Sequence, residues 1–547
     1  MDRYYWLNDE SRQFLGRGYL LPGVTPEQRI RQIGDYAEKI LGEKGFSDLF
    51  EDCMSKGWFS LSTPVWANFG LNRGLGISCF GVTIQDNLPD ILRASSEVGM
   101  LCKYGGGTAG YFGNLRHRGA VITDNGVSSG AVHFMEIFET VANTISQGSS
   151  RRGHFAAYLP IDHPDAMEFL NIKDEGNSIK DISIAVTVSD DFIGRLKNRD
   201  TSAEELWVRV IQKRFETGYP YVFFDGNVNK GKPKVYKDKG MQIKHSQMCS
   251  EILEYTDESK SFTCCLSSMN LLHYDEWKGT NAVAILTKLL DAVLTDFIDR
   301  ADKIPFLEKT VKFAKEHRSI GLGVLGYHSY LQSKRIPFEG IQAQIINRII
   351  FKEIDRQSLE VSKELANRFG EPDVLKGYGE RFTTRLAIAP TTSSSFILGQ
   401  VSPSIEPLNS NYFLKDLAKG KFPYRNPHLK EVLASYDKDD EATWHSILMH
   451  GGSVQHLKFL NADDKMVFKT FGEISQLEIV RQAAARQQYI DQGQSLNLMI
   501  HPDTPVHEVH SLMMEAHELG IKTLYYQRSA NVAQEVSRDL MNCVSCE

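Results

Sequence analysis

The chain has 547 residues and a formal net charge of −7, with 41% hydrophobic and 24% charged residues. A net negative charge argues against a broad nucleic-acid-binding surface, and the length indicates several domains or one large α/β body. The polar start MDRYYWLNDESRQFL is not a signal peptide, and no apolar run reaches membrane-spanning length. Eight cysteines are too few for a disulfide scaffold of this length, so the cytoplasm is the expected location.

Residues 1–75 are expected to form a mostly helical region. In TPEQRIRQIGDYAEKILG, Thr25 is a plausible N-cap and Pro26 a plausible first helical residue. Apolar side chains then recur at helical spacing, at Ile30, Ile33, Ala37 and Ile40.

From about residue 76, strand-like and helix-like segments alternate. GISCFGVTI (76–84) is strand-like and runs into a helical segment that Asp86 or Asn87 would cap. ISIAVTV (182–188) is a second strand candidate. This alternation predicts an α/β fold with largely parallel strands.

The last part of the chain continues the pattern. Long helices are expected over 342–369 and within TPVHEVHSLMMEAHELG, where Gly520 is the stop signal. A strand, KTLYYQ, follows at once and carries Tyr525 and Tyr526. In a regular strand these rings would point to opposite faces. Residues 529–547 lack a core pattern and are expected to form a mobile tail.

The tail ends in a CxxC motif formed by Cys543 and Cys546. Three interpretations compete: a structural zinc site, unreactive surface thiols, and a dithiol that exchanges with another disulfide. A zinc site needs four ligands, and the sequence has no second CxxC or CxxH. The exchanging dithiol is favoured because CxxC spacing supports a reactive thiolate and a mobile tail gives access.

Other cysteines lie in apolar surroundings. Cys79 and the pair Cys264–Cys265 fall in stretches that look like buried strands, where cysteine is usually a small core residue. Cys249 lies two residues before Glu251, on the same side of the chain if this segment is extended. A carboxylate in an apolar stretch is costly unless it is paired or functional.

Polar loops supply candidate anion sites. Thr391–Ser395 is a run of five hydroxyl residues that would suit either phosphate binding at a helix start or an ordinary cap. QGSSRRGHFAAY (147–158) is typical of a loop that touches an anionic ligand. KYGGGTAGYFGNLRHRG (103–119) is glycine-rich but lacks the GxxxxGK[ST] pattern of a P-loop.

Together these segments resemble the large, catalytic subunit of class I ribonucleotide reductases, from about residue 10 to the C-terminus. The resemblance implies a ten-stranded α/β barrel of two parallel five-stranded halves (residues 76–528), preceded by the helical region. A finger loop with Cys249 would enter the barrel. The motifs, in order, are LSTPVWAN, SCFGVTIQD, QGSSRRG, CSEI, CCLSSMNL, APTTSSS, QSLNL, LYYQ and the terminal CxxC.

The resemblance assigns roles to the buried groups. Cys249 matches the cysteine that becomes a thiyl radical and removes the ribose 3′-hydrogen, and Glu251 the carboxylate that takes the 3′-hydroxyl proton. Cys79 and Cys264 match the pair that supplies two electrons and closes as a disulfide. Gln247 stands where relatives usually have asparagine, so an altered hydrogen bond to substrate is expected.

The resemblance also implies partners. Tyr525 and Tyr526 match the pair that relays the radical from a metal-containing small subunit, so this chain is expected to bind no metal or cofactor itself. A relay needs neighbouring rings in series, so the strand is expected to end or bend at Tyr525–Tyr526. Cys543 and Cys546 match the tail dithiol that re-reduces the active site, with thioredoxin or glutaredoxin as the external reductant.

Ligand sites follow in the same way. Residues expected to hold the phosphates and ribose of a ribonucleoside diphosphate are Thr63, Ser78, Pro390, Thr391, Thr392, Ser393 and Ser394. A homodimer would carry a specificity site for dATP/ATP, dTTP or dGTP, with Asp86 and Arg116 binding the nucleotide. Gln147 and Arg151 would pass the signal to the substrate site.

Two alternatives stay open. A class II, cobalamin-dependent reductase shares the barrel and the radical cysteine but needs no tyrosine pair. A nucleotide-binding relative without catalysis would lack one of the reactive residues, and none is missing. The chain enters its helical region almost at once, so it is expected to lack the regulatory ATP-cone that precedes many relatives.

Overall fold

The computed structural model describes residues 3–147, 153–417 and 420–529. Its N-terminal region is helical, and the helix predicted from Thr25 onward is confirmed, because the Thr25 and Gln28 side chains form a capping box. A short strand, β1 (Phe59–Leu61), joins this region to the barrel. The helices are α1 (Asp9–Leu15), α2 (Pro26–Leu41), α3 (Phe46–Ser55) and α4 (Thr63–Asn68).

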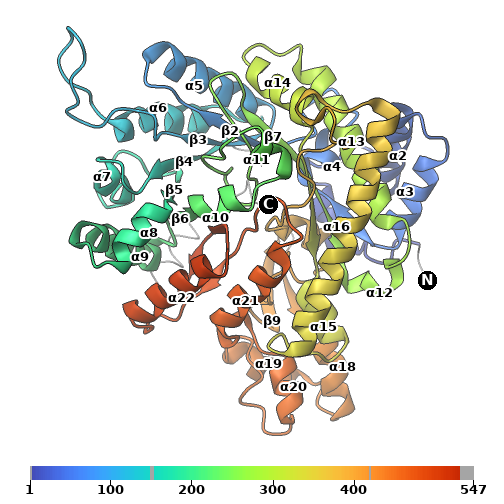
Figure 1. Cartoon of the computed structure of the whole chain (residues 1–547). Helices are drawn as coiled ribbons and strands as arrows, with labels where there is room; N and C mark the ends of the chain where they lie inside the picture. The colour runs from blue at the N-terminus through green and yellow to red at the C-terminus, as the bar shows by residue number, and fades with distance from the viewer. Residues whose placement is uncertain (1–2, 148–152, 418–419, 530–547) are drawn as a thin grey trace.

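The first half of the barrel is a parallel sheet in chain order, and it contains both strands predicted from the sequence. Its strands are β2 (Cys79–Thr83), β3 (Gly107–Tyr111), β4 (His154–Pro160), β5 (Ser183–Val188) and β6 (Tyr221–Phe224). Figure 1 shows helices flanking these strands. They are α5 (Leu88–Lys103), α6 (Ala131–Thr144), α7 (Ala166–Leu170), α8 (Asp190–Lys197), α9 (Thr201–Thr217), α10 (Asp225–Lys230) and α11 (Lys234–Asp238).

The second half is also parallel but less regular. β7 (Phe262–Asn270) pairs with β8 (Ile320–Leu325), and two parallel bridges then extend the ladder. These bridges join Leu322 to Leu386 and Ile388 to Gln494. The ladder ends where β11 (Leu498–Met499) runs parallel to β13 (Gln527–Arg528).

Two antiparallel seams join the halves. β2 pairs with β7 at one seam, and β6 pairs with β12 (Thr523–Leu524) at the other. Five parallel strands, β2 to β6, therefore face five parallel segments of the second half, which closes the ring and confirms the predicted ten-stranded barrel. The segments of the second half are β7, β8, 386–388, 494–499 and 523–528.

The remaining elements cover the second half of the barrel. The longest of the helices labelled there is α16, the yellow helix in Figure 1. The helices between β7 and β9 are η1 (Leu271–His273), α12 (Tyr274–Trp277), α13 (Ala282–Ala301), α14 (Glu308–His317), α15 (Tyr327–Ser333), α16 (Ile341–Phe369), η2 (Asp373–Leu375) and α17 (Thr392–Ile397). A second, smaller core involves residues of α18, α19 and α20. The C-terminal elements are β9 (Tyr412–Leu417), β10 (Gly420–Arg425), α18 (Pro427–Ser435), α19 (Glu441–Met449), α20 (Ala462–Val467), η3 (Phe471–Glu473), α21 (Gln476–Gln487) and α22 (Val506–Glu518).

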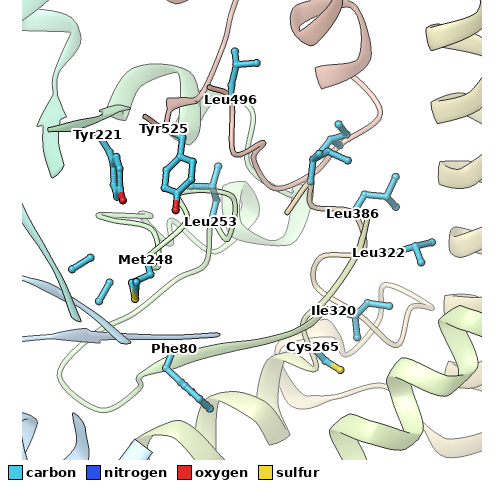
Figure 2. Packing of buried hydrophobic residues seen from close by; sticks show 14 of the residues in the cluster. Phe80, Tyr221, Met248, Leu253, Cys265, Ile320, Leu322, Leu386, Leu496 and Tyr525 are labelled. Carbon is cyan, nitrogen blue, oxygen red and sulfur yellow. The ribbon is translucent and has the colours of Figure 1, made fainter. Parts of the chain in front are cut away.

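The loop between α11 and β7 is held by both halves. The Tyr158 hydroxyl of β4 donates to the carbonyl of Gln247 at 2.7 Å, and Thr523 Oγ1 of β12 donates to the carbonyl of Ser250 at 2.9 Å. Figure 2 shows Met248 of this loop and Phe80 of the barrel wall in one packed cluster. In the part of the chain that the structure describes, no helix has both the length and the apolar character needed to cross a membrane.

Candidate active site

One cavity collects three of the predicted reactive residues and most of the predicted substrate-binding residues. Cys79, Cys249 and Glu251 line it, and the rest of its wall is rich in hydroxyl groups. Four stretches of the chain build this wall: 62–64, 78–79, 266–268 and 389–394. Its other lining residues are Ser62, Thr63, Pro64, Ser78, Leu266, Ser267, Ser268, Ala389, Pro390, Thr391, Ser393 and Ser394.

The β2–β7 seam sets Cys79 directly opposite Cys264. Directly opposed residues of an antiparallel pair have Cα atoms about 4.5–5.5 Å apart, which is within the range that a disulfide requires. Both cysteines are present as thiols in this structure. Cys265 belongs to the main hydrophobic core instead, because successive strand residues point to opposite faces. Cys264 is therefore the residue that pairs with Cys79.

Cys249 and Glu251 come together through a turn. The segment is not extended here, because Ser250 between them has a φ of 66°, in the left-handed region. The turn still brings both side chains to the cavity. The Ser495 hydroxyl lies 2.6 Å from the Cys249 carbonyl and 2.9 Å from Glu251 Oε2, so one group braces both residues.

Glu251 is suited to exchange a proton near neutral pH. Burial raises the pKa of its carboxyl to about 7, and the hydrogen bond from Ser495 opposes part of this rise. Gln247 lies beside Glu251, and its Oε1 accepts from Ser246 Oγ and from the Ile252 amide. The Gln247 side chain acts on Glu251 and lowers the pKa of its carboxyl against the effect of burial. Within the described residues its buried Nε2 has no other partner, and Gln247 does not line the cavity.

The hydroxyl groups lie where two short helices begin. Thr63 is the first residue of α4, and Thr391 is the N-cap of α17. Thr391 Oγ1 accepts from the Ser404 amide at 2.7 Å, and Ser394 Oγ donates to the Leu61 carbonyl at 3.2 Å. Free amide groups at helix starts attract anions. Thr392, by contrast, is exposed and does not line the cavity.

The strand KTLYYQ breaks at the two tyrosines, as predicted. β12 ends at Leu524 and β13 begins at Gln527, and the centroids of the Tyr525 and Tyr526 rings are 4.3 Å apart. Tyr525 is buried and Tyr526 half-buried. Figure 2 shows the Tyr525 hydroxyl pointing to the side where Met248, the residue before Cys249, lies.

Two further tyrosines extend this cluster and were missed in the sequence. The Tyr221 ring centroid is 4.5 Å from that of Tyr525 and 5.1 Å from that of Tyr526. The Tyr219 hydroxyl lies 3.0 Å from the Tyr526 hydroxyl. The sequence signal is YPYVFF (219–224), an apolar run that begins with two tyrosines at strand spacing. Ser495 was also missed, although its motif QSLNL was noted.

The predicted effector residues lie elsewhere. Arg116 Nε donates to Asp86 Oδ2 at 2.7 Å, and both side chains are about one third exposed, at 37% and 34%. Gln147 Nε2 donates to Asn68 Oδ1 at 3.2 Å. Asn68 is the last residue of α4, so Gln147 touches the same helix whose first turn lines the cavity.

Three predicted residues lie outside the described part of the chain: Arg151 and the tail cysteines Cys543 and Cys546. Within the described residues, no group of three or more histidine, cysteine or acidic side chains is arranged to hold a metal ion.

The comparisons with known proteins agree with this geometry. The family model "Ribonucleotide reductase, barrel domain" matches residues 77–203, 194–374 and 372–527. The alpha subunit of the class Id ribonucleotide reductase of Actinobacillus ureae is 49% identical, with a TM-score of 0.92 and 99% of each chain covered.

Viral proteins are also similar. The ribonucleoside-diphosphate reductase large subunit of Invertebrate iridescent virus 3 is 34% identical over 585 residues, covering 93% of this chain and 91% of that protein. That of Vaccinia virus (strain Copenhagen) is 28% identical, covering 87% and 71%. The fold and the cavity define a class of protein: an α/β barrel with cysteines in an internal site. The chain belongs to the ribonucleotide reductase family.

Proposed function

We propose that the chain is the catalytic subunit of a class I ribonucleoside-diphosphate reductase, which replaces the 2′-hydroxyl of a ribonucleotide by hydrogen. One observation carries the proposal: a single cavity brings Cys249 and Glu251 to Cys79, which lies directly opposite Cys264 across the β2–β7 seam. These groups match the hydrogen-atom carrier, the base and the reductant that this reaction needs.

The chemistry balances with these groups. A thiyl radical at Cys249 takes the 3′-hydrogen atom, and Glu251 accepts the 3′-hydroxyl proton. The 2′-hydroxyl then leaves as water with one thiol hydrogen of the Cys79–Cys264 pair. The other thiol hydrogen goes to C2′, and the two sulfur atoms join as a disulfide. Glu251 gives its proton back to the 3′ oxygen, and Cys249 finally returns its hydrogen atom to C3′ and regains the radical.

Substrate binding would use the hydroxyl-rich wall of the cavity. The starts of α4 and α17 would hold the diphosphate through Thr63, Thr391 and their neighbours. Gln247, in place of the usual asparagine, would act on the ribose through Glu251, whose pKa it lowers.

The tyrosine cluster supports class I over class II. Tyr526 and Tyr525 would carry the radical from a small subunit, whose metal makes it. A groove of about 540 Å³ between α21 and α22 lies next to this entry point, since its residue Met499 pairs with Arg528 of β13. The groove gives such a partner a surface beside Tyr526.

Regulation and re-reduction complete the proposal. Nucleoside triphosphate effectors (dATP/ATP, dTTP or dGTP) would bind near Asp86 and Arg116 in a homodimer. Leu88 and Leu92 on the adjacent helix α5 are 57% and 49% exposed, which supports a covering subunit there. Cys543 and Cys546 would reduce the active-site disulfide and be reduced in turn by thioredoxin or glutaredoxin in the cytoplasm.

The test is an assay of the four ribonucleoside diphosphates, with and without the cognate small subunit, across the effectors. We expect deoxynucleotide only with both subunits, and none from a Cys249→Ala variant that still binds substrate. Turnover with adenosylcobalamin alone would move the chain to class II. Full activity of Cys249→Ala would refute the mechanism.

A further inference from the structure

A second buried carboxyl group, Glu254, lies behind the cysteine pair and has no role in the chemistry above. Its side chain is fully buried. Tyr236 donates its hydroxyl to Glu254 Oε2 at 2.6 Å, and the hydroxyls of Ser319 and Thr384 both donate to Oε1. Such a well-partnered carboxyl is held in one fixed position.

Ser319 connects this carboxyl to Cys264. β7 and β8 pair with Cys265 opposite Ile320, so Ser319, the residue before β8, is level with Cys264. The thiol also packs against β8, since a Cβ atom at Gly321 would lie 3.2 Å from Cys264 Sγ. Burial and then the charge of Glu254 raise the pKa of Cys264. Hydrogen bonds from Gln492, whose Nε2 donates to Cys264 Sγ at 3.5 Å, and from Ser319 lower it.

Reopening the disulfide creates a need for a proton at this place. Cys79 lines the cavity and is half-buried, whereas Cys264 is 1% exposed, so an incoming dithiol reaches Cys79. Attack on Cys79 expels Cys264 as a thiolate. A buried thiolate is costly, and burial raises the pKa of Cys264 well above its ordinary value. A proton donor therefore assists the departure of Cys264 from the disulfide.

Glu254 is suited to supply that proton. Burial raises the pKa of Glu254 to about 7, so the neutral acid is well populated near neutral pH. The thiol is the much weaker acid of the two, and proton transfer from Glu254 to the thiolate is downhill. Tyr236 extends the hydrogen-bond network beyond Glu254, since its hydroxyl lies 2.8 Å from His317 Nδ1.

We propose that Glu254, acting through the Ser319 hydroxyl, protonates Cys264 when a dithiol opens the Cys79–Cys264 disulfide. The inference rests on the proposed function for the existence of that disulfide. One dithiol sulfur bonds to Cys79 while the S–S bond breaks, and its electron pair leaves on Cys264. Glu254 gives a proton to Cys264, and the second dithiol sulfur then displaces Cys79 and forms the oxidised dithiol. The two protons that the dithiol sulfurs release restore the acid form of Glu254 and the thiol of Cys79.

The chain offers a matched control in Glu97. It is also buried, accepts from two hydroxyls (Thr310 at 2.6 Å and Ser261 at 3.1 Å), and has its pKa raised to about 7 by burial. Its hydroxyl partners are Thr310 and Ser261, whereas Ser319, which links Glu254 to Cys264, is not among the partners that the described residues give it. Glu97→Gln therefore reproduces the structural cost of the substitution without removing the proposed donor.

The experiment uses the full chain with its small subunit and separates two steps. Pre-reduced enzyme without external reductant reports the deoxynucleotide formed in a single turnover. Oxidised enzyme in dithiothreitol, quenched by alkylation, reports how fast Cys79 and Cys264 become free. We expect Glu254→Gln and Ser319→Ala to keep the single-turnover yield and to slow reopening by roughly 100-fold at pH 7. Glu97→Gln should reopen at the wild-type rate.

A pH profile distinguishes a proton donor from a structural residue. The rate of disulfide reopening is divided by the concentration of dithiothreitol thiolate, which removes the titration of the reductant itself. This corrected rate should fall in the wild type as pH rises through about 7, and it should not change with pH in Glu254→Gln. The other titratable groups that face Glu254 are Tyr236, His317, Asp491 and Cys264, and an Asp491→Asn variant separates its titration.

Each remaining outcome is decisive. Equal reopening rates for Glu254→Gln and Glu97→Gln would overturn the inference. The inference would also be overturned if Glu254→Gln lost its single-turnover yield while Ser319→Ala reopened the disulfide at the normal rate. Glu254 would then be a structural residue. Wild-type enzyme that forms no Cys79–Cys264 disulfide on turnover would instead refute the proposed function.

Discussion

The two antiparallel seams of the barrel place reactive side chains in opposite ways. At the β2–β7 seam the ladder is regular, and it sets Cys79 directly opposite Cys264. At the β6–β12 seam the strand stops after Leu524, and the next two residues are both tyrosines with their rings in contact. Extending this register by one residue brings Tyr525 opposite Tyr221, and their ring centroids are 4.5 Å apart.

The difference follows from strand geometry. Regular pairing brings two residues from different strands close enough for a covalent bond. It also turns adjacent residues of one strand to opposite faces, which would separate Tyr525 from Tyr526. A break in the strand removes that alternation and lets neighbouring rings lie in series. One seam therefore suits a bond, and the other suits a relay.

The largest effect is expected at the broken seam. Tyr526→Phe keeps the ring contacts but removes the phenol that a radical relay needs, so turnover should fall to background. Calorimetry should show substrate and effector binding unchanged. If binding is lost while the circular dichroism spectrum stays that of the wild type, Tyr526 is a structural residue instead.

Between the seams, Glu251→Gln should lower the turnover rate by roughly 100- to 10,000-fold, since a general base contributes about that much. The pKa of Glu251 is raised to about 7, so wild-type activity should rise with pH as the carboxylate forms around that value. The same rise in pKa means that the buried carboxyl contributes stability fully below its ordinary pKa and loses it as pH increases through about 7. An unchanged pH–rate profile in the variant would assign the titration to another group.

A smaller effect should distinguish the added tyrosines. Tyr219→Phe removes the hydroxyl that lies 3.0 Å from the Tyr526 hydroxyl, and a lost hydrogen bond of about 1 kcal/mol corresponds to roughly fivefold in rate. Tyr221→Phe is the control, because it keeps the ring that packs against both Tyr525 and Tyr526. A larger loss in Tyr221→Phe would show that the hydrogen bond from Tyr219 does not set the Tyr526 geometry.

The smallest change tests the regular seam. Gly81 pairs with Phe262, and a Cβ atom at Gly81 would overlap the Phe262 ring. Gly81→Ala should lower the free energy of unfolding by about 1–3 kcal/mol in urea titrations. Gly194→Ala in helix α8, where a Cβ atom meets nothing within 4 Å, should instead stabilise by about 0.5–1 kcal/mol. Equal effects would mean that the seam tolerates overpacking.

Local sequence determined the elements, and the resemblance supplied the candidate reactive residues. The Thr25 cap, the strands near Cys79 and over 182–188, and the break at Tyr525–Tyr526 were all predicted from spacing or from the resemblance, and the structure confirms these elements. They depend on neighbours within a few residues, whose propensities and periodicity the sequence displays directly.

The tertiary structure alone decided how these pieces meet. Ser495 braces Cys249 and Glu251 from some 240 residues away, and the left-handed conformation of Ser250 turns both side chains to the cavity. Tyr219 joins Tyr526, and Ser319 joins Glu254, only because the barrel closes at its two seams. Such contacts depend on strand register and ring closure over hundreds of residues, which no local pattern in a single sequence encodes.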